Sequence, residues 1–161
     1  LKATQLSQLP LVDLSQSPST IGKAIHKACT KVGFFYCINH GVSVHVCESV
    51  LSEARTFFTL NEKEKQKISI QNSESFRGYQ SFGENVTSGS ADAHEALDFF
   101  SESEDAKCFQ PTNYGTNQWP CAQPKLQPVM ESYVQEMTSV GKKLLQGCAL
   151  GLNLKNPAYF E

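Results

Sequence analysis

The stretch GFFYCINHG, residues 33–41, decides the fold of this chain. Aromatic and apolar residues continue without a break as far as Ile38, which is typical of a strand that is buried on both faces. Asn39-His40-Gly41 then ends the segment, and the glycine gives the backbone the freedom to turn away. We therefore expect a buried strand over residues 33–39, followed by a sharp turn.

An amphipathic helix is predicted on each side of this strand. Ser17-Pro18 indicates a helix start, because serine caps the first turn and proline fits the first helical position. Gly33 suits the C-terminal end of this helix, and Ser43 can cap the helix that follows the strand. Apolar residues recur at helical spacing in both segments: Ile21, Ala24, Ile25, Ala28, Cys29 and Val32, and then Val46, Val50, Ala54, Phe57 and Phe58.

The rest of the chain predicts short strands, loops and one long helix. Leu9–Leu14 and Ala96–Phe100 have the composition of strands, whereas 71–91 is rich in Ser, Gly, Asn and Gln and predicts loop with short irregular strands. The mixed-charge run 61–67 indicates a solvated last turn or a short extra helix. Apolar residues at helical spacing between Leu126 and Cys148 predict a long helix over 124–151.

These elements predict a mixed α/β (α+β) fold. The three predicted strands, Leu9–Leu14, Gly33–Asn39 and Ala96–Phe100, would form one small sheet with exposed edges unless further strands joined it. Three amphipathic helices on so little sheet imply a partner surface. The chain starts at Leu1 rather than at Met, so we expect a piece of something longer.

Composition excludes several classes of protein. The 161 residues suit one domain, and 14 Lys+Arg against 16 Asp+Glu lack the basic surplus of a nucleic-acid binder. No stretch approaches the roughly 18 apolar residues that span a bilayer, so no membrane partner is expected. The six cysteines form no CxxC pair. Reduced thiols and a cytoplasmic location are therefore predicted.

Candidate metal sites are weak. Cys37, His40, His45 and Cys47 lie within eleven residues, but they lack the paired short knuckles typical of zinc sites, and the helix carrying His45 and Cys47 turns them to either side of its buried face. A small zinc-stabilised domain stays open as an alternative. An iron site of the strand-borne facial-triad type needs His-x-Asp or His-x-Glu, and the chain contains neither. We therefore predict no metal ligands and no catalytic residues.

Six motifs occur in the order found in the N-terminal domain of the iron(II)/2-oxoglutarate-dependent dioxygenases of the isopenicillin N synthase-like superfamily. They are Leu9-Pro10-Leu11-Val12-Asp13-Leu14, Gly33-Phe34-Phe35-Tyr36-Cys37-Ile38-Asn39-His40-Gly41-Val42, Ala54-Arg55-Thr56-Phe57-Phe58-Thr59-Leu60, Arg77-Gly78-Tyr79, Glu95-Ala96-Leu97-Asp98-Phe99 and Gly115-Thr116-Asn117-Gln118-Trp119-Pro120. The chain resembles this non-haem dioxygenase N-terminal domain over 1–161, with the core motifs in about 9–120 and the long helix in 124–151.

The resemblance implies a function that this chain does not complete by itself. In the family, iron is held by His-x-Asp…His and 2-oxoglutarate by Arg-x-Ser, both in a C-terminal double-stranded β-helix, a jelly-roll relative. The chain then looks like a fragment of an oxidoreductase that acts on a small molecule. It would pack on the missing jelly-roll domain, bind no cofactor and be inactive alone. The alternative outside enzymology is a non-catalytic interaction module that docks on a separate partner.

The resemblance also implies roles for a few residues. Asn39, His40 and Gly41 match a turn whose expected role is structural, ending the strand and launching the helix. Arg77 and Tyr79 precede the substrate-facing strands of the family and are candidates to contact a substrate carboxylate or hydroxyl. A surface ion pair is the alternative for Arg77.

Overall fold

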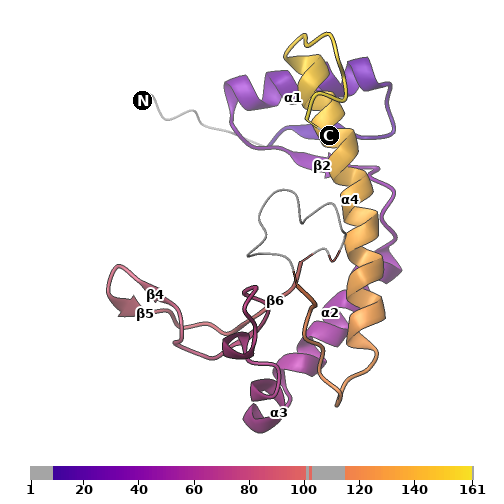
Figure 1. Ribbon diagram of the computed structural model, residues 1–161. Helices are drawn as coiled ribbons and strands as arrows, with labels where there is room; N and C mark the ends of the chain where they lie inside the picture. The colour runs from indigo at the N-terminus through magenta and orange to yellow at the C-terminus, as the bar shows by residue number, and fades with distance from the viewer. Residues whose placement is uncertain (1–8, 101, 103–114, 161) are drawn as a thin grey trace. The chain divides into compact units, whose positions relative to one another are not determined.

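The structure, a computed structural model, describes residues 9–100, 102 and 115–160, in two compact units (Figure 1). The first unit comprises Leu1–Cys47 with Ser132–Glu161, and the second comprises Glu48–Glu131. The helices and short strands occur in this order along the chain: β1 (Leu11–Asp13), α1 (Pro18–Lys31), β2 (Tyr36–Ile38), α2 (Val44–Phe58), α3 (Glu62–Gln66), the 3-10 helix η1 (Ile70–Asn72), β3 (Gly78–Gln80), β4 (Val86–Thr87), β5 (Ser90–Ala91), β6 (Ala96–Asp98) and α4 (Leu126–Gly151). The predicted mixed α/β fold class is confirmed.

The predicted helix boundaries of the first unit are confirmed by their caps. The Ser17 hydroxyl accepts the Thr20 N–H at 3.3 Å, and Pro18 occupies the first position of α1. At the other end, Gly33 has a φ of +89° and donates its N–H to the Ala28 carbonyl at 3.0 Å. The helix is therefore followed by a residue in the left-handed conformation, which favours glycine.

The strand predicted over residues 33–39 is shorter than expected and is not buried on both faces. Only Tyr36–Ile38 forms β2, which pairs in parallel with β1. The inner face of this pair carries Val12 and Cys37, which pack on the core. On the outer face Phe34 is 73%, Tyr36 61% and Leu11 60% exposed. The aromatic run therefore builds one core face and one uncovered apolar face.

The core of the first unit lies between the inner face of this sheet, α1 and α4. Its buried members are Val12, Leu14, Ile21, Ile25, Val42 and Val140. Glycines bring α1 close to α4: a Cβ placed on Gly22 would lie 3.0 Å from the Gly147 carbonyl oxygen and 3.0 Å from the Gly151 nitrogen. Small residues permit such close approach because nothing projects between the two backbones.

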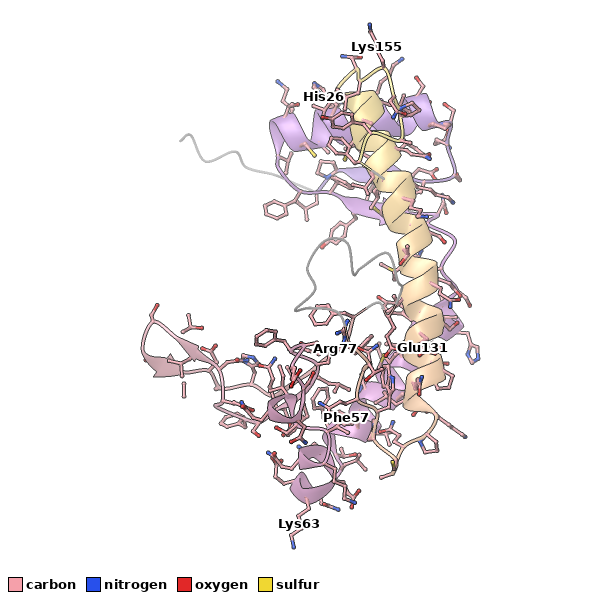
Figure 2. The ribbon with its side chains drawn as sticks, in the orientation of Figure 1. His26, Phe57, Lys63, Arg77, Glu131 and Lys155 are labelled. Atoms are coloured by element: carbon pink, nitrogen blue, oxygen red, sulfur yellow. The ribbon has the colours of Figure 1, made fainter. Side chains whose placement is uncertain are left out.

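The second unit has its own core and two separate strand pairs. Phe57, Ile68, Tyr79, Leu126 and Met130 are its buried members (Figure 2 labels Phe57). The antiparallel pair β3–β6 lies against this core, whereas the hairpin β4–β5 is exposed. The predicted single sheet is therefore wrong: β6 pairs with β3 and not with β1 or β2. Strand pairing is non-local, and strand composition alone does not specify a partner.

None of the helices in the described ranges combines the length and the apolarity needed to span a lipid bilayer. The five described cysteines are free thiols, whereas Cys108 lies outside the described residues.

The α1–α4 contact predicts the response to added methyl groups. Gly22→Ala should lower the free energy of unfolding by about 1–3 kcal/mol, because its Cβ meets backbone atoms that cannot move aside. Gly141→Ala in α4 is the matched control: a Cβ there meets nothing within 4 Å, so better helix propensity should stabilise the chain by about 1 kcal/mol. Urea unfolding followed by circular dichroism measures both. Equal effects of the two substitutions would contradict the close contact.

Candidate functional site

The site predicted around Arg77 and Tyr79 lies on and beside β3. Arg77 has no exposed surface, which argues against the alternative of a surface ion pair. Figure 2 labels its position in the second unit. Its backbone N–H donates to the Ser73 hydroxyl at 3.2 Å, and its carbonyl accepts from the Gln118 side-chain amide at 2.6 Å. The guanidinium carbon lies 5.3 Å from the centre of the Phe100 ring, within range of a cation–π contact.

Tyr79 joins the core to a polar network. Its ring lies in the core, 6.0 Å from the ring of Phe57 and edge-on to it. Its hydroxyl donates to Glu95 Oε2 at 2.5 Å and lies 3.2 Å from Glu62 Oε2. Burial and the hydrogen bond to Glu95 raise the pKa of Tyr79 to about 12. Tyr79 is therefore a neutral hydrogen-bond donor at neutral pH.

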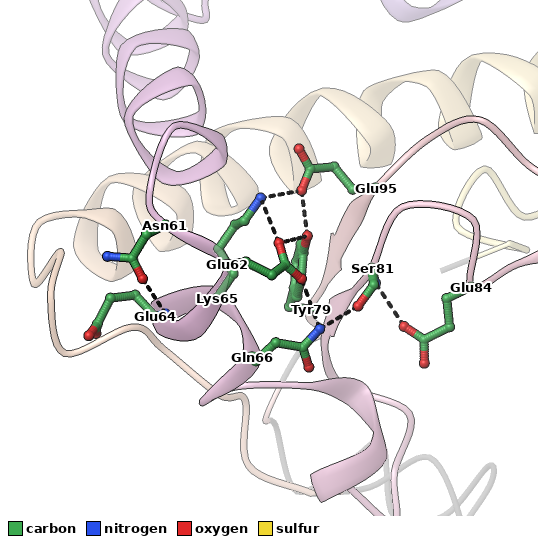
Figure 3. Close-up of polar contacts among 9 residues, drawn as sticks. All are labelled: Asn61, Glu62, Glu64, Lys65, Gln66, Tyr79, Ser81, Glu84 and Glu95. Carbon is green, nitrogen blue, oxygen red and sulfur yellow. Dashed lines mark hydrogen bonds and ion pairs between the residues drawn. The ribbon is translucent and has the colours of Figure 1, made fainter.

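Lys65 completes this network, which consists of Lys65, Glu95, Tyr79 and Glu62 (Figure 3). The ammonium nitrogen lies 2.6 Å from Glu95 Oε2 and 3.4 Å from Glu62 Oε2, and only 8% of the Lys65 side chain is exposed. Burial alone would lower the pKa of Lys65, but the bonds to Glu95 and Tyr79 outweigh it and raise that pKa. Burial likewise opposes ionisation of Glu95, but Lys65 and Tyr79 lower its pKa overall.

The network was not predicted from the sequence, although the position of Glu95 in its strand could have indicated that its side chain faces the core. Lys65 belongs to the mixed-charge run that was predicted to be solvated, and that prediction is wrong for this residue. The short helix itself is confirmed: it is α3, and the Asn61 side chain caps it at the Glu64 N–H. Alternate residues of a strand share a face, so Glu95 lies on the face of Leu97 and Phe99, which pack on the core. A carboxylate on the core-facing side of a strand needs a cation beside it, because an unpaired buried charge is unfavourable.

The opposite face of the same strand pair is polar and open. Gln80 and Asp98 point away from the core, and the Gln80 amide donates to the Asp98 carboxylate. This face borders a depression of about 490 Å³ in the second unit. The β3–β6 pair thus has an inner face, which carries the buried network, and an outer face that a ligand can reach.

The turn Asn39-His40-Gly41 makes its contacts within the first unit. The Asn39 side chain donates to Asp13 Oδ1 at 3.0 Å, which ties the turn to β1. The Val42 N–H donates to His40 Nδ1 at 3.1 Å, and Gly41 has a φ of +89°. Hydrogen bonds from Ser15, Asn39 and Gln16 hold the pKa of Asp13 well below its usual range.

The residues that the structure describes form no ligand set for an iron or a zinc ion. Within the described ranges no group of three or more His, Cys, Asp or Glu side chains is placed to hold a metal. Cys37, His40, His45 and Cys47 all lie in these ranges, so they do not form a ligand set here. Burial also raises the pKa of the Cys37 thiol, which opposes the thiolate that zinc requires.

The buried network predicts unequal effects for two lysines. Lys65→Met leaves the Glu95 carboxylate without its cation and should lower the free energy of unfolding at pH 7 by about 1–3 kcal/mol. Lys67→Met is the control, because Lys67 is 63% exposed in its ion pair with Glu64 and should cost less than about 1 kcal/mol. Urea unfolding compares the two.

The pH dependence checks the cause. Because the folded-state pKa of Glu95 is lowered, its contribution is full above the ordinary value of 4.5 and is lost as the pH falls through the folded value. The difference between the wild type and Lys65→Met should therefore shrink below pH 4.5. A difference that stays constant from pH 7 into this range would show that lost packing, not lost charge, causes it.

Solved structures show the same fold. A full-length Neurospora crassa protein, solved in complex with alpha-KG, superposes with a TM-score of 0.74 at 22% identity, over 94% of this chain and 49% of that one. A putative 2OG-Fe(II) oxygenase family protein from Caulobacter crescentus superposes with a TM-score of 0.75 at 18% identity, over 96% of this chain and 52% of that one. At these identities the likeness establishes the fold alone.

Curated relatives share much more of the sequence. Homoarginine-6-hydroxylase 2-ODD-C23.1 of Arabidopsis thaliana is 35% identical over 99% of this chain and 52% of its own length. A homoarginine-6-hydroxylase of Glycine max is also 35% identical, over 99% of this chain and 53% of its own length. The chain thus spans about half the length of these relatives.

The family model described as "non-haem dioxygenase in morphine synthesis N-terminal" matches residues 9–122. This match includes the turn at Asn39, the buried network and the β3–β6 pair. It covers most of the chain, and the relatives above are dioxygenases of the 2-oxoglutarate/Fe(II) class. The chain therefore belongs to the non-haem dioxygenase family, as its N-terminal domain.

Proposed function

We propose that this chain serves as the N-terminal half of a non-haem Fe(II)/2-oxoglutarate-dependent dioxygenase that oxidises a small molecule. The observation that carries the proposal is the match of 99% of this chain to 52% of a homoarginine-6-hydroxylase. The remaining length of such a relative leaves room for a second domain, here the jelly-roll half, which would hold iron and 2-oxoglutarate. When bound there, iron and 2-oxoglutarate would activate O2 for the oxidation. This half would supply the scaffold and part of the wall of the substrate pocket.

The proposal assigns no turnover to this chain alone. It contains four histidines and no His-x-Asp or His-x-Glu, and its described residues place no ligand set. The free thiols of the described cysteines support a reducing, cytoplasmic location.

The uncovered face of the β1–β2 pair supports a large packing partner. Phe34, Tyr36 and Leu11 are exposed together there, and apolar patches of this kind mark interfaces. We assign this face to the jelly-roll half. A non-catalytic module would use the same face for a separately encoded partner, and the two functions differ in whether the complete protein turns over 2-oxoglutarate.

The structure supports a role for the turn residues more directly than for Arg77 and Tyr79. A structural role for Asn39, His40 and Gly41 is supported by the Asn39–Asp13 bond and by the left-handed Gly41. Contact of Arg77 and Tyr79 with a substrate stays a prediction. Both side chains are buried in this chain, so such contact would require a substrate that reaches beneath the surface described here.

Iron content and turnover test the proposal. The complete protein should bind Fe(II) and release CO2 from 2-oxoglutarate, and homoarginine is the first substrate to offer because several relatives carry that activity in their names. This chain alone should do neither, because its sequence has no His-x-Asp or His-x-Glu and its described residues form no ligand set. Metal analysis and CO2 release measure both. Stoichiometric iron or turnover in this chain alone would refute the division of labour.

The sheet face gives a second test. Phe34→Ser should change the stability of this chain alone by less than about 0.5 kcal/mol, because the ring is already in water. In the complete protein the same change should cost about 2 kcal/mol of buried apolar surface. Val12→Ser, on the inner face of the same pair, should destabilise both forms. If Phe34→Ser changes the stability of both forms by the same small amount, the assignment of this face to the jelly-roll half is wrong.

A further inference from the structure

The depression beside β3–β6 has the size of a small-molecule site. Its volume of about 490 Å³ lies within the range of roughly 300–1,000 Å³ found for ligand pockets. The lining comes from η1, from the loop before β3, from the loop between β3 and β4, and from the outer face of the strand pair with Phe100, which follows it. The described residues that matter for recognition are Gln71, Phe76, Gln80, Glu84, Asp98 and Phe100.

Its two charged lining residues, Glu84 and Asp98, are acids held by neutral donors. The Gln71 amide donates to Glu84 Oε1 at 2.7 Å, and the Ser81 N–H donates to Oε2 at 2.7 Å. These bonds lower the pKa of Glu84, so it is ionised at neutral pH. The described ion pairs all use Glu62, Glu64 or Glu95 instead. Within the described part of the chain, two negative charges therefore face the depression without a basic partner.

Asp98 keeps one carboxylate oxygen available. The Gln80 amide donates to Oδ2, and a second amide, that of Asn85, orients Gln80 through its carbonyl oxygen. Oδ1 accepts no hydrogen bond from the described residues. The amide chain thus holds the carboxylate of a residue that lines the depression and leaves one of its oxygens without a hydrogen bond from the described residues.

Aromatic rings complete the lining. Phe76 is 62% exposed and has a φ of +56°, a left-handed conformation that is unusual for a bulky residue. Phe100 is 55% exposed, and its ring already lies against the guanidinium of Arg77 at 5.3 Å. Exposed rings beside carboxylates favour organic cations, because the ring face is negative.

We propose that this depression binds the guanidinium or ammonium end of a basic small-molecule substrate. Asp98 and Glu84 supply the charge, and Phe76 supplies an aromatic face. The inference rests on the proposed function and deepens it, because it names the substrate class and the residues of this half that select it. A neutral isostere would leave both carboxylates desolvated and unpaired, which is the source of specificity.

Binding to this chain tests the site directly. Backbone amide NMR shifts should move around η1, β3 and β6 on titration with homoarginine or arginine, and should not move with citrulline, whose side chain has the same shape but no charge. Asp98→Asn and Glu84→Gln should each weaken the binding about tenfold or more, because each removes a charge-assisted hydrogen bond. Glu48→Gln removes one charge from an exposed site on α2 and should leave binding unchanged.

The outcomes separate this inference from the proposed function. Shifts that map elsewhere, equal response to citrulline, or unchanged affinity in both variants would overturn the site; the wild-type shift map decides even if a variant misfolds. In the complete protein, Asp98→Asn should raise KM for a cationic substrate about tenfold with little change in kcat. Cation-specific shifts in this chain together with no 2-oxoglutarate turnover in the complete protein would uphold the site and refute the enzyme.

Discussion

The ammonium group of Lys65 is the interaction on which the second unit depends. It neutralises Glu95 at 2.6 Å, and Glu95 in turn accepts the Tyr79 hydroxyl. Moving a charge from water into the protein interior costs several kcal/mol unless an opposite charge lies next to it. The contacts among Lys65, Glu95 and Tyr79 therefore hold α3, β3 and the start of β6 in one arrangement. Because Glu95 is held inward, the next residues alternate: Leu97 and Phe99 face the core, and Asp98 and Phe100 face outward. The register of one strand thereby determines which side chains can meet a ligand.

The helices could be predicted from residues close together in the sequence, whereas contacts between distant segments could not. Ser17-Pro18 and Gly33 marked both ends of α1 because capping is decided within a few residues. The pairing of β6 with β3 was missed, because it joins segments that neither composition nor spacing connects. Lys65 was placed in solvent because a charged run is normally exposed; its burial depends on an acid thirty residues away. The outer depression was missed for the same reason, since its carboxylates come from separate loops and strands.

The first unit shows why this half suits a partner. Its inner sheet face is fully used by α1 and α4, whose close approach depends on Gly22 and Gly147. Its outer face carries Phe34 and Tyr36 in water. One sheet face therefore stabilises this chain, and the other is the face that we propose packs on a second domain. The resemblance carried by GFFYCINHG and the family match over residues 9–122 agree that the chain is the N-terminal domain of this family.

We propose above that this chain acts as one half of a dioxygenase. The most direct measurement adds it to the separately produced C-terminal half of the complete protein and follows CO2 release from 2-oxoglutarate with homoarginine present. We expect turnover only when both halves are present. Full turnover by the C-terminal half without this chain, or any turnover by this chain without the C-terminal half, would contradict it.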